Sequence, residues 1–161
     1  MMRIYIGTRR TRLSHSALRY KIHGGKRMKF EMDLLRDLLI YIEDKADRPI
    51  SELDGVELEG WTPEQVAYHV VLAEEDGLIR AIIDQIPDDD DPDSSHVAYS
   101  IQRLTSRGHE LLGNIREARH WKAIRSGVEK AGTFTIGAMA RFAEAYVTMK
   151  AKELIGWPEG Q

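Results

Sequence analysis

The chain of 161 residues is 42% hydrophobic and 30% charged, contains no cysteine and carries a formal net charge of −3 at pH 7. This length suits one compact domain, and the lack of cysteine excludes disulfides, thiolate catalysis and cysteine-based zinc sites. A chain without cysteine also fits a reducing cytoplasm. Because no window approaches the roughly 18 uninterrupted apolar residues of a membrane span, we expect a cytoplasmic protein that does not bind membranes.

The charged residues are unevenly distributed along the chain. Residues 1–27 hold eight of the 23 basic side chains and no acidic one. Residues 28–161 therefore hold 15 basic side chains against all 26 acidic ones, a formal charge of −11. A field of this sign repels nucleic acid, so it weighs against DNA as a partner.

Residues 1–27 show no sustained helical or alternating apolar pattern. We interpret them as a disordered basic extension ahead of a single domain over residues 28–161, and translation from Met28 would omit them. Two other interpretations stay open: an organellar transit peptide, rich in Arg and Ser, and a basic arm that binds phosphate. Arg9 and Arg10 resemble a twin-arginine export signal, but no apolar stretch follows them.

The first half of the domain predicts two helices and a short strand. A helix over residues 31–45 follows from an amphipathic pattern whose apolar side chains are Leu34, Leu35, Leu38, Leu39 and Ile42. Val56 and Leu58 alternate with acidic residues, which favours a strand within residues 50–59. Thr62 as the N-cap and Pro63 in the first turn predict a second helix over residues 62–76.

The second half predicts a hairpin followed by two helices. Strands are expected over residues 78–86 and 96–104, with the acidic run DDDDPD over residues 88–93 as a solvated tip. One long helix is expected over residues 105–132, ending at a glycine, and the last over residues 136–154. The fold predicted is mostly helical α+β: a winged-helix-like domain (helix, strand, helix, β-hairpin wing) with two additional C-terminal helices.

Four segments resemble, in order and spacing, the uncharacterised bacterial and phage-associated proteins of domain-of-unknown-function family twenty-five-thirteen. They are MDLLRDLLIYIED, LEGWTPEQVAYHVVLAEEDGLI, RLTSRGHELLGNIREARHW, and the stretch from KAGTFTIGAMARF to KELIG. The resemblance spans most of residues 31–156 and leaves out residues 1–27, which favours Met28 as the start. It implies a winged-helix-like fold with added C-terminal helices. It transfers no functional residue, because the family has no established activity.

The helix over residues 62–76 takes the place of the recognition helix in winged-helix regulators, so one hypothesis is a small bacterial or prophage regulator that binds duplex DNA. Its predicted contacts are Gln65 and Tyr68 on the helix, with Arg80, Arg103 and Arg107 beside it. However, the helix contains four acidic residues and no Lys or Arg, which opposes contact with phosphate. A helix-turn-helix also needs a helix shortly before this one, and residues 50–59 are too short and strand-like to supply it.

The alternative hypothesis is a non-enzymatic protein-interaction module built on the same scaffold. Glu64, Tyr68 and Val71 would present an acidic, partly apolar face to a basic protein partner. The apolar residues of the last helix predict in addition that the protein forms a homodimer.

None of the catalytic or metal-binding motifs that we considered is complete. The sequence HELLG from His109 begins like the zinc motif HExxH but has Gly113 in place of the second histidine. The acidic run over residues 88–93 lacks the glycine and glutamate positions of a calcium loop. His69 is interpreted as a helix-surface or packing residue. We therefore expect no enzyme activity, no metal and no cofactor.

Overall fold

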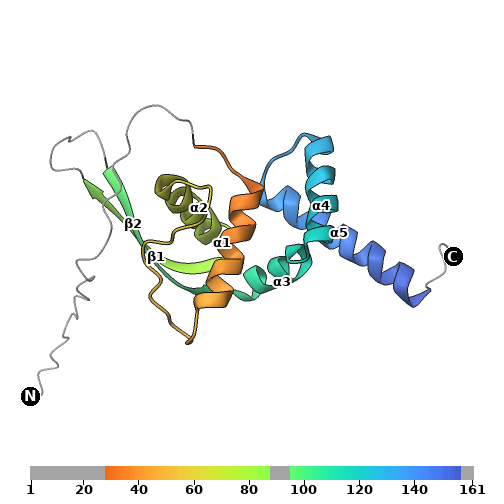
Figure 1. Cartoon of the computed structure of the whole chain (residues 1–161), viewed down its shortest axis with the longest axis horizontal. Helices are drawn as coiled ribbons and strands as arrows, with labels where there is room; N and C mark the ends of the chain where they lie inside the picture. The colour runs from red at the N-terminus through yellow and green to blue at the C-terminus, as the bar shows by residue number, and fades with distance from the viewer. Residues whose placement is uncertain (1–27, 88–94, 157–161) are drawn as a thin grey trace, which may run out of the picture.

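A computed structural model describes residues 28–87 and 95–156 (Figure 1). The predicted basic extension over residues 1–27 and the predicted acidic tip over residues 88–93 lie outside this part. The elements are helices α1 (Met32–Lys45) and α2 (Pro63–Glu75), strands β1 (Ile79–Pro87) and β2 (Ser95–Leu104), and helices α3 (Ser106–Ile115), α4 (Ala118–Ala131) and α5 (Ile136–Ile155). This content confirms the predicted mostly helical α+β fold.

The strands β1 and β2 form an antiparallel hairpin that contacts α1 and α2. Ile79 pairs with Leu104, and both side chains are buried in the core. The next pair, Arg80 and Arg103, lies on the opposite face, because successive side chains of a strand alternate. A bulge after Arg80 shifts the register and pairs the next residue with the buried Ile101.

The hydrophobic core is centred on α1, which presents one fully apolar face. The buried side chains of that face include Leu34, Leu35, Leu38, Leu39 and Ile42. The same cluster extends through α2, the base of the hairpin and the three helices that follow, from Met32 to Ala143, with partly buried residues packed against it from Phe30 to Tyr146. Among the described residues, this core and the side chains packed on it therefore lie between Phe30 and Tyr146.

The strand predicted within residues 50–59 is wrong except at one position. Leu53 forms a single antiparallel bridge with Ile101 of β2. Beyond it, Gly55 takes a left-handed conformation with φ of 56° and turns the chain away from the sheet edge. The side chain of Val56 is nevertheless buried, and its N–H donates to the hydroxyl of Tyr99 at 3.0 Å.

The single helix predicted over residues 105–132 is also wrong, because it is divided into α3 and α4. Within the described residues, three helices therefore follow the hairpin instead of the predicted two. The division occurs where Arg36 of α1 donates from Nε to the carbonyl oxygen of Ile115 at 2.9 Å and from Nη2 to that of Arg116 at 2.5 Å. These bonds satisfy carbonyls at the end of α3, so the helix ends there without leaving them unpaired.

Helices α4 and α5 pack against each other, and both contact α3. The Nε1 atom of Trp121 on α4 donates to Oδ1 of Asp33 on α1 at 2.8 Å, which fixes the new direction of α4. The last helix follows its predicted bounds closely, and its final turns project from the rest of the molecule (Figure 1). Within the described residues, no helix combines the length and the apolar character needed to cross a membrane.

Candidate partner-binding site

The N-terminus of α2 is fixed by a capping box. The hydroxyl of Thr62 accepts from the N–H of Gln65 at 3.3 Å, and the side-chain oxygen of Gln65 accepts from the N–H of Thr62 at 3.1 Å. Pro63 follows the cap, as predicted. The Gln65 amide, one of the predicted DNA contacts, is thus held by its own helix.

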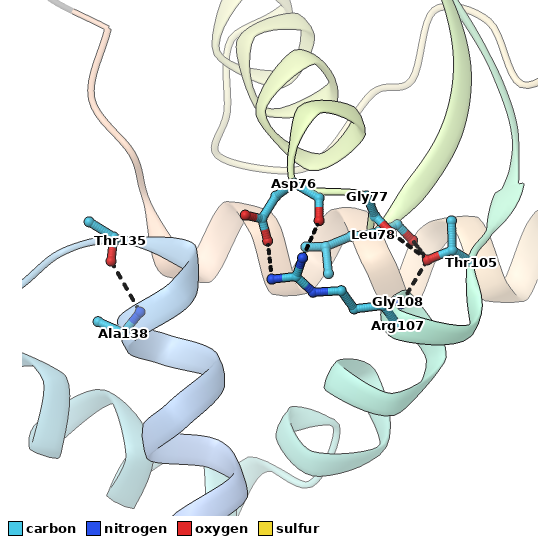
Figure 2. Close-up of polar contacts among 8 residues, drawn as sticks. All are labelled: Asp76, Gly77, Leu78, Thr105, Arg107, Gly108, Thr135 and Ala138. Atoms are coloured by element: carbon cyan, nitrogen blue, oxygen red, sulfur yellow. Dashed lines mark hydrogen bonds and ion pairs between the residues drawn. The ribbon is translucent and has the colours of Figure 1, made fainter.

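The C-terminal end of α2 is tied to α3 through Asp76 and Arg107 (Figure 2). Nη1 of Arg107 donates to the carbonyl oxygen of Asp76 at 2.7 Å. Nη2 lies 2.8 Å from the buried Oδ2 of the Asp76 carboxylate, as an ion pair rather than an aligned hydrogen bond. Because acidic residues are unfavourable at the negative end of a helix dipole, Arg107 offsets charge that α2 itself places there. Arg107, one of the predicted DNA contacts, is therefore engaged within the protein.

Thr105 connects the hairpin to α2 and α3 at the same place (Figure 2). Its hydroxyl donates to the carbonyl oxygen of Gly77 at 2.6 Å and accepts from the N–H of Gly108 at 3.1 Å. Its own N–H donates to the carbonyl oxygen of Leu78 at 2.9 Å. A Cβ atom on residue 108 would lie 2.0 Å from that Leu78 oxygen, so the site excludes any side chain.

A groove of about 350 Å³ opens between α2 and the start of α5. Its apolar lining consists of Phe30, Tyr68, Leu72, Phe134 and Ile136. Phe134 is 52% exposed, so half of its ring offers apolar surface to solvent. On the α5 side, Thr135 accepts from the N–H of Ala138 at 3.1 Å and caps the helix (Figure 2).

The α2 wall of the groove is acidic. Glu75 and Asp76 line it, and no Lys or Arg occurs between Thr62 and Asp76. Asp76 is paired with Arg107, whereas the exposed Glu75 has no ion-pair partner among the described residues. The negative end of the α2 dipole adds to this charge. The groove therefore combines an apolar floor with a wall that attracts cations.

Phe30 is held at the groove by a buried histidine. The rings of Phe30 and His69 stack with their centroids 5.8 Å apart. Nε2 of His69 accepts from the N–H of Glu31, the N-cap of α1, at 2.8 Å, and Nδ1 donates to the carbonyl oxygen of Gln65 at 2.8 Å. Burial lowers the pKa of His69, which favours this neutral form. His69 is thus a packing residue, as interpreted, and it also caps α1.

The groove includes one of the three residues of the predicted partner-binding face, although helical spacing places all three on one side of α2. Tyr68 lines the groove, whereas Val71 and Glu64 are partly buried on α2 and are not part of the lining. The sequence did not identify Phe30 or Phe134 as site residues, because each is a single apolar residue beside a predicted helix and neither completes a periodic pattern.

Of the predicted nucleic-acid contacts, the structure brings together Arg80 and Arg103. They are directly opposite in the hairpin and both are exposed. Arg103 donates from Nη1 to the carbonyl oxygen of Leu104 at 3.0 Å, and neither arginine has an acidic partner among the described residues. The other predicted contacts, Gln65, Tyr68 and Arg107, are engaged at the α2 ends or in the groove.

Comparison with known proteins assigns the chain to a family. The family model described as "Hypothetical protein (DUF2513)" matches residues 29–134. The chain belongs to the DUF2513 family. The part of this DUF2513 protein that matches includes α1, α2, the hairpin and the aromatic pair Phe30 and Phe134, and stops before α5.

A protein of Haemophilus influenzae, described as "Uncharacterized protein", is similar to this DUF2513 protein. The two are 29% identical over 123 residues, which cover 75% of this chain and 97% of the relative. No solved structure matches the chain. The likeness to winged-helix domains therefore stays a prediction based on the order of the elements.

Proposed function

We propose that this DUF2513 protein is a non-enzymatic protein-interaction module that binds a basic peptide segment in the groove between α2 and α5. The observation that carries the proposal is the half-exposed Phe134 beside the acidic wall at Glu75. The fitting partner alternates apolar side chains with Lys or Arg. Its apolar side chains would cover Phe134 and Tyr68, and its cations would lie near Glu75.

The geometry supports weak rather than tight binding. Burying one aliphatic side chain contributes about 1.5–3 kcal/mol, and an exposed ion pair contributes about 1 kcal/mol or less. After the cost of association, a few such contacts leave a Kd on the order of 0.1 mM. Such an affinity suits a module whose partner is held nearby or binds at several points.

The test is fluorescence anisotropy with a labelled synthetic peptide in which Arg alternates with Leu and Phe. Purified residues 28–161 should bind this probe, and they should bind the same peptide with Glu in place of Arg at least tenfold more weakly. Phe134→Ser should weaken binding of the probe several-fold. Ile82→Ser, at a 46% exposed position on the hairpin, is the matched control and should change nothing. Equal effects of the two substitutions would sink the proposal.

A second function, binding of duplex DNA by a winged-helix regulator, is favoured by the pairing of Arg80 with Arg103. Like charges directly opposite in a hairpin destabilise it, and a phosphate between these two arginines would offset their repulsion. This function predicts a gel shift at low salt that weakens as salt rises and is lost in the variant Arg80→Glu with Arg103→Glu. If wild-type protein shifts no duplex at low salt, this function is removed.

The predicted homodimer would form through a second copy of α5. Tyr146 still contacts His120, in the first turn of α4, with ring centroids 5.3 Å apart. The turns after Tyr146 expose Met149, Leu154 and Ile155, and self-association is the simplest way for this DUF2513 protein to cover them. Native mass measurement at tens of micromolar should show dimer, and the substitution Leu154→Glu should give monomer. A wild-type protein that is entirely monomeric would remove the prediction.

A further inference from the structure

We infer that residues 18–22 of the same chain occupy the groove, so that the basic extension shields it from other partners until a stronger ligand displaces it. The inference rests on the proposed function, because it assumes that the groove accepts basic peptides. It adds an identified occupant, and it gives residues 1–27 a regulatory role in place of the expectation that translation from Met28 omits them.

The sequence of this segment matches the chemistry of the groove. Residues 18–22 read Leu-Arg-Tyr-Lys-Ile, so that apolar and basic side chains alternate. In an extended peptide, alternate side chains point to opposite sides. Leu18, Tyr20 and Ile22 would therefore face the apolar lining, while Arg19 and Lys21 would stay at the rim near Glu75.

The position of the segment in the chain brings it to the groove. The described residues begin at Met28, two positions before Phe30, which lines the groove. Between Ile22 and Met28 lie five residues, which span up to about 17 Å when extended. Gly24 and Gly25 are among them, and glycine permits the chain to reverse its direction there.

The charge distribution favours this occupant over an acidic or neutral segment. Residues 1–27 carry eight basic side chains and no acidic one, whereas residues 28–161 have a formal charge of −11. The acidic wall of the groove is formed by Glu75 and the C-terminal end of α2. Residues 1–27, which directly precede the described domain, carry the opposite charge and are attracted to this wall.

Covalent attachment makes a weak contact sufficient. A segment on a short flexible linker has an effective concentration of roughly millimolar at its site. If the segment binds with a Kd on the order of 0.1 mM, as expected for the probe, it occupies the groove in about ten of every eleven molecules. An added peptide should then bind the whole chain about tenfold more weakly than a chain that lacks the segment.

The experiment compares three proteins with the labelled Arg, Leu and Phe probe: the whole chain, residues 28–161, and the whole chain with Leu18→Ser, Tyr20→Ser and Ile22→Ser. Residues 28–161 contain the entire described core, and circular dichroism would check that all three proteins are folded. We expect residues 28–161 to bind the probe about tenfold more tightly than the whole chain. The triple variant should bind within about twofold of residues 28–161, although it keeps all eight basic side chains.

The possible outcomes separate this inference from the proposed function. If the whole chain and residues 28–161 bind the probe equally, the shielding is refuted while the groove remains a peptide site. A triple variant that binds as weakly as the wild-type chain would show that charge alone repels the probe. That outcome also refutes the shielding. A difference that grows with protein concentration would assign the groove to the extension of a second copy. If no protein binds the probe, the proposed function fails as well.

Discussion

The substitution Gly108→Ala tests the junction that holds α2, the hairpin and α3 together. A Cβ atom on residue 108 would stand 2.0 Å from the carbonyl oxygen of Leu78 and 3.0 Å from its carbonyl carbon. Both are backbone atoms, so no side-chain rotation can relieve the overlap. The strand or the helix must move, and with it the hydrogen bonds of Thr105 to Gly77, Leu78 and Gly108.

The expected loss combines two effects. Inserting a methyl group into a packed site costs about 1–3 kcal/mol, and weakening the Thr105 cap of α3 costs about 1 kcal/mol more. A total of about 3 kcal/mol would lower the melting temperature by roughly 6–12 °C for a protein of this size. Gly113→Ala is the matched control, because it lies in the same helix with no atom within 4 Å of its Cβ position. There, alanine should stabilise the helix by about 0.5–1 kcal/mol.

Urea unfolding followed by circular dichroism at 222 nm measures both variants. The reasoning requires opposite signs: destabilisation at residue 108 and slight stabilisation at residue 113. If Gly108→Ala is as stable as the wild-type protein, α3 does not approach the Leu78 carbonyl this closely.

Two further predictions concern groups that join α1 to its neighbours. The pKa of the His69 imidazole is lowered in the folded state by burial. As the pH drops from about 7 to 5, the unfolded chain therefore protonates at this imidazole before the folded protein does, and the free energy of unfolding should fall. The slope reaches at most about 1.4 kcal/mol per pH unit, and it should be flatter in His69→Gln when unfolding is measured across that range. Trp121→Phe should lower the free energy of unfolding by about 1–2 kcal/mol, because it removes the donor to Asp33 while retaining an aromatic ring; a loss below about 0.3 kcal/mol would mean that this bond contributes nothing.

Local sequence signals predicted most of the elements. The apolar face of α1 and the Thr62 and Pro63 start of α2 are short-range patterns, and the structure has both. The helix break after α3 also had a local signal: the buried Ile115 and Trp121 are six residues apart, which does not continue one helical face. Residues 115–121 contain no proline or glycine to end a helix, so the sequence still predicts one continuous helix there.

The candidate site was harder to predict because it depends on contacts between distant residues. Phe30 and Phe134 lie on the same groove only because His69 positions one ring and α5 begins beside α2. Likewise, the engagement of Arg107 by Asp76 joins the ends of two helices. Sequence alone shows the charge of such residues and not their partners. The sequence therefore predicts the acidic character of the α2 face but not the exposed Phe134 beside it.

The most direct test of peptide binding in the groove is a charge exchange at Glu75. Within residues 28–161, the variant Glu75→Lys should bind the Arg-containing probe more weakly than the unsubstituted protein and the Glu-containing peptide more tightly, each by about three- to tenfold. Glu57→Lys makes the same change of charge at an exposed position that is not part of the groove lining, and it should shift both affinities by less than about twofold. If the two substitutions change the affinities equally, peptide binding follows net charge alone and the groove is not the site.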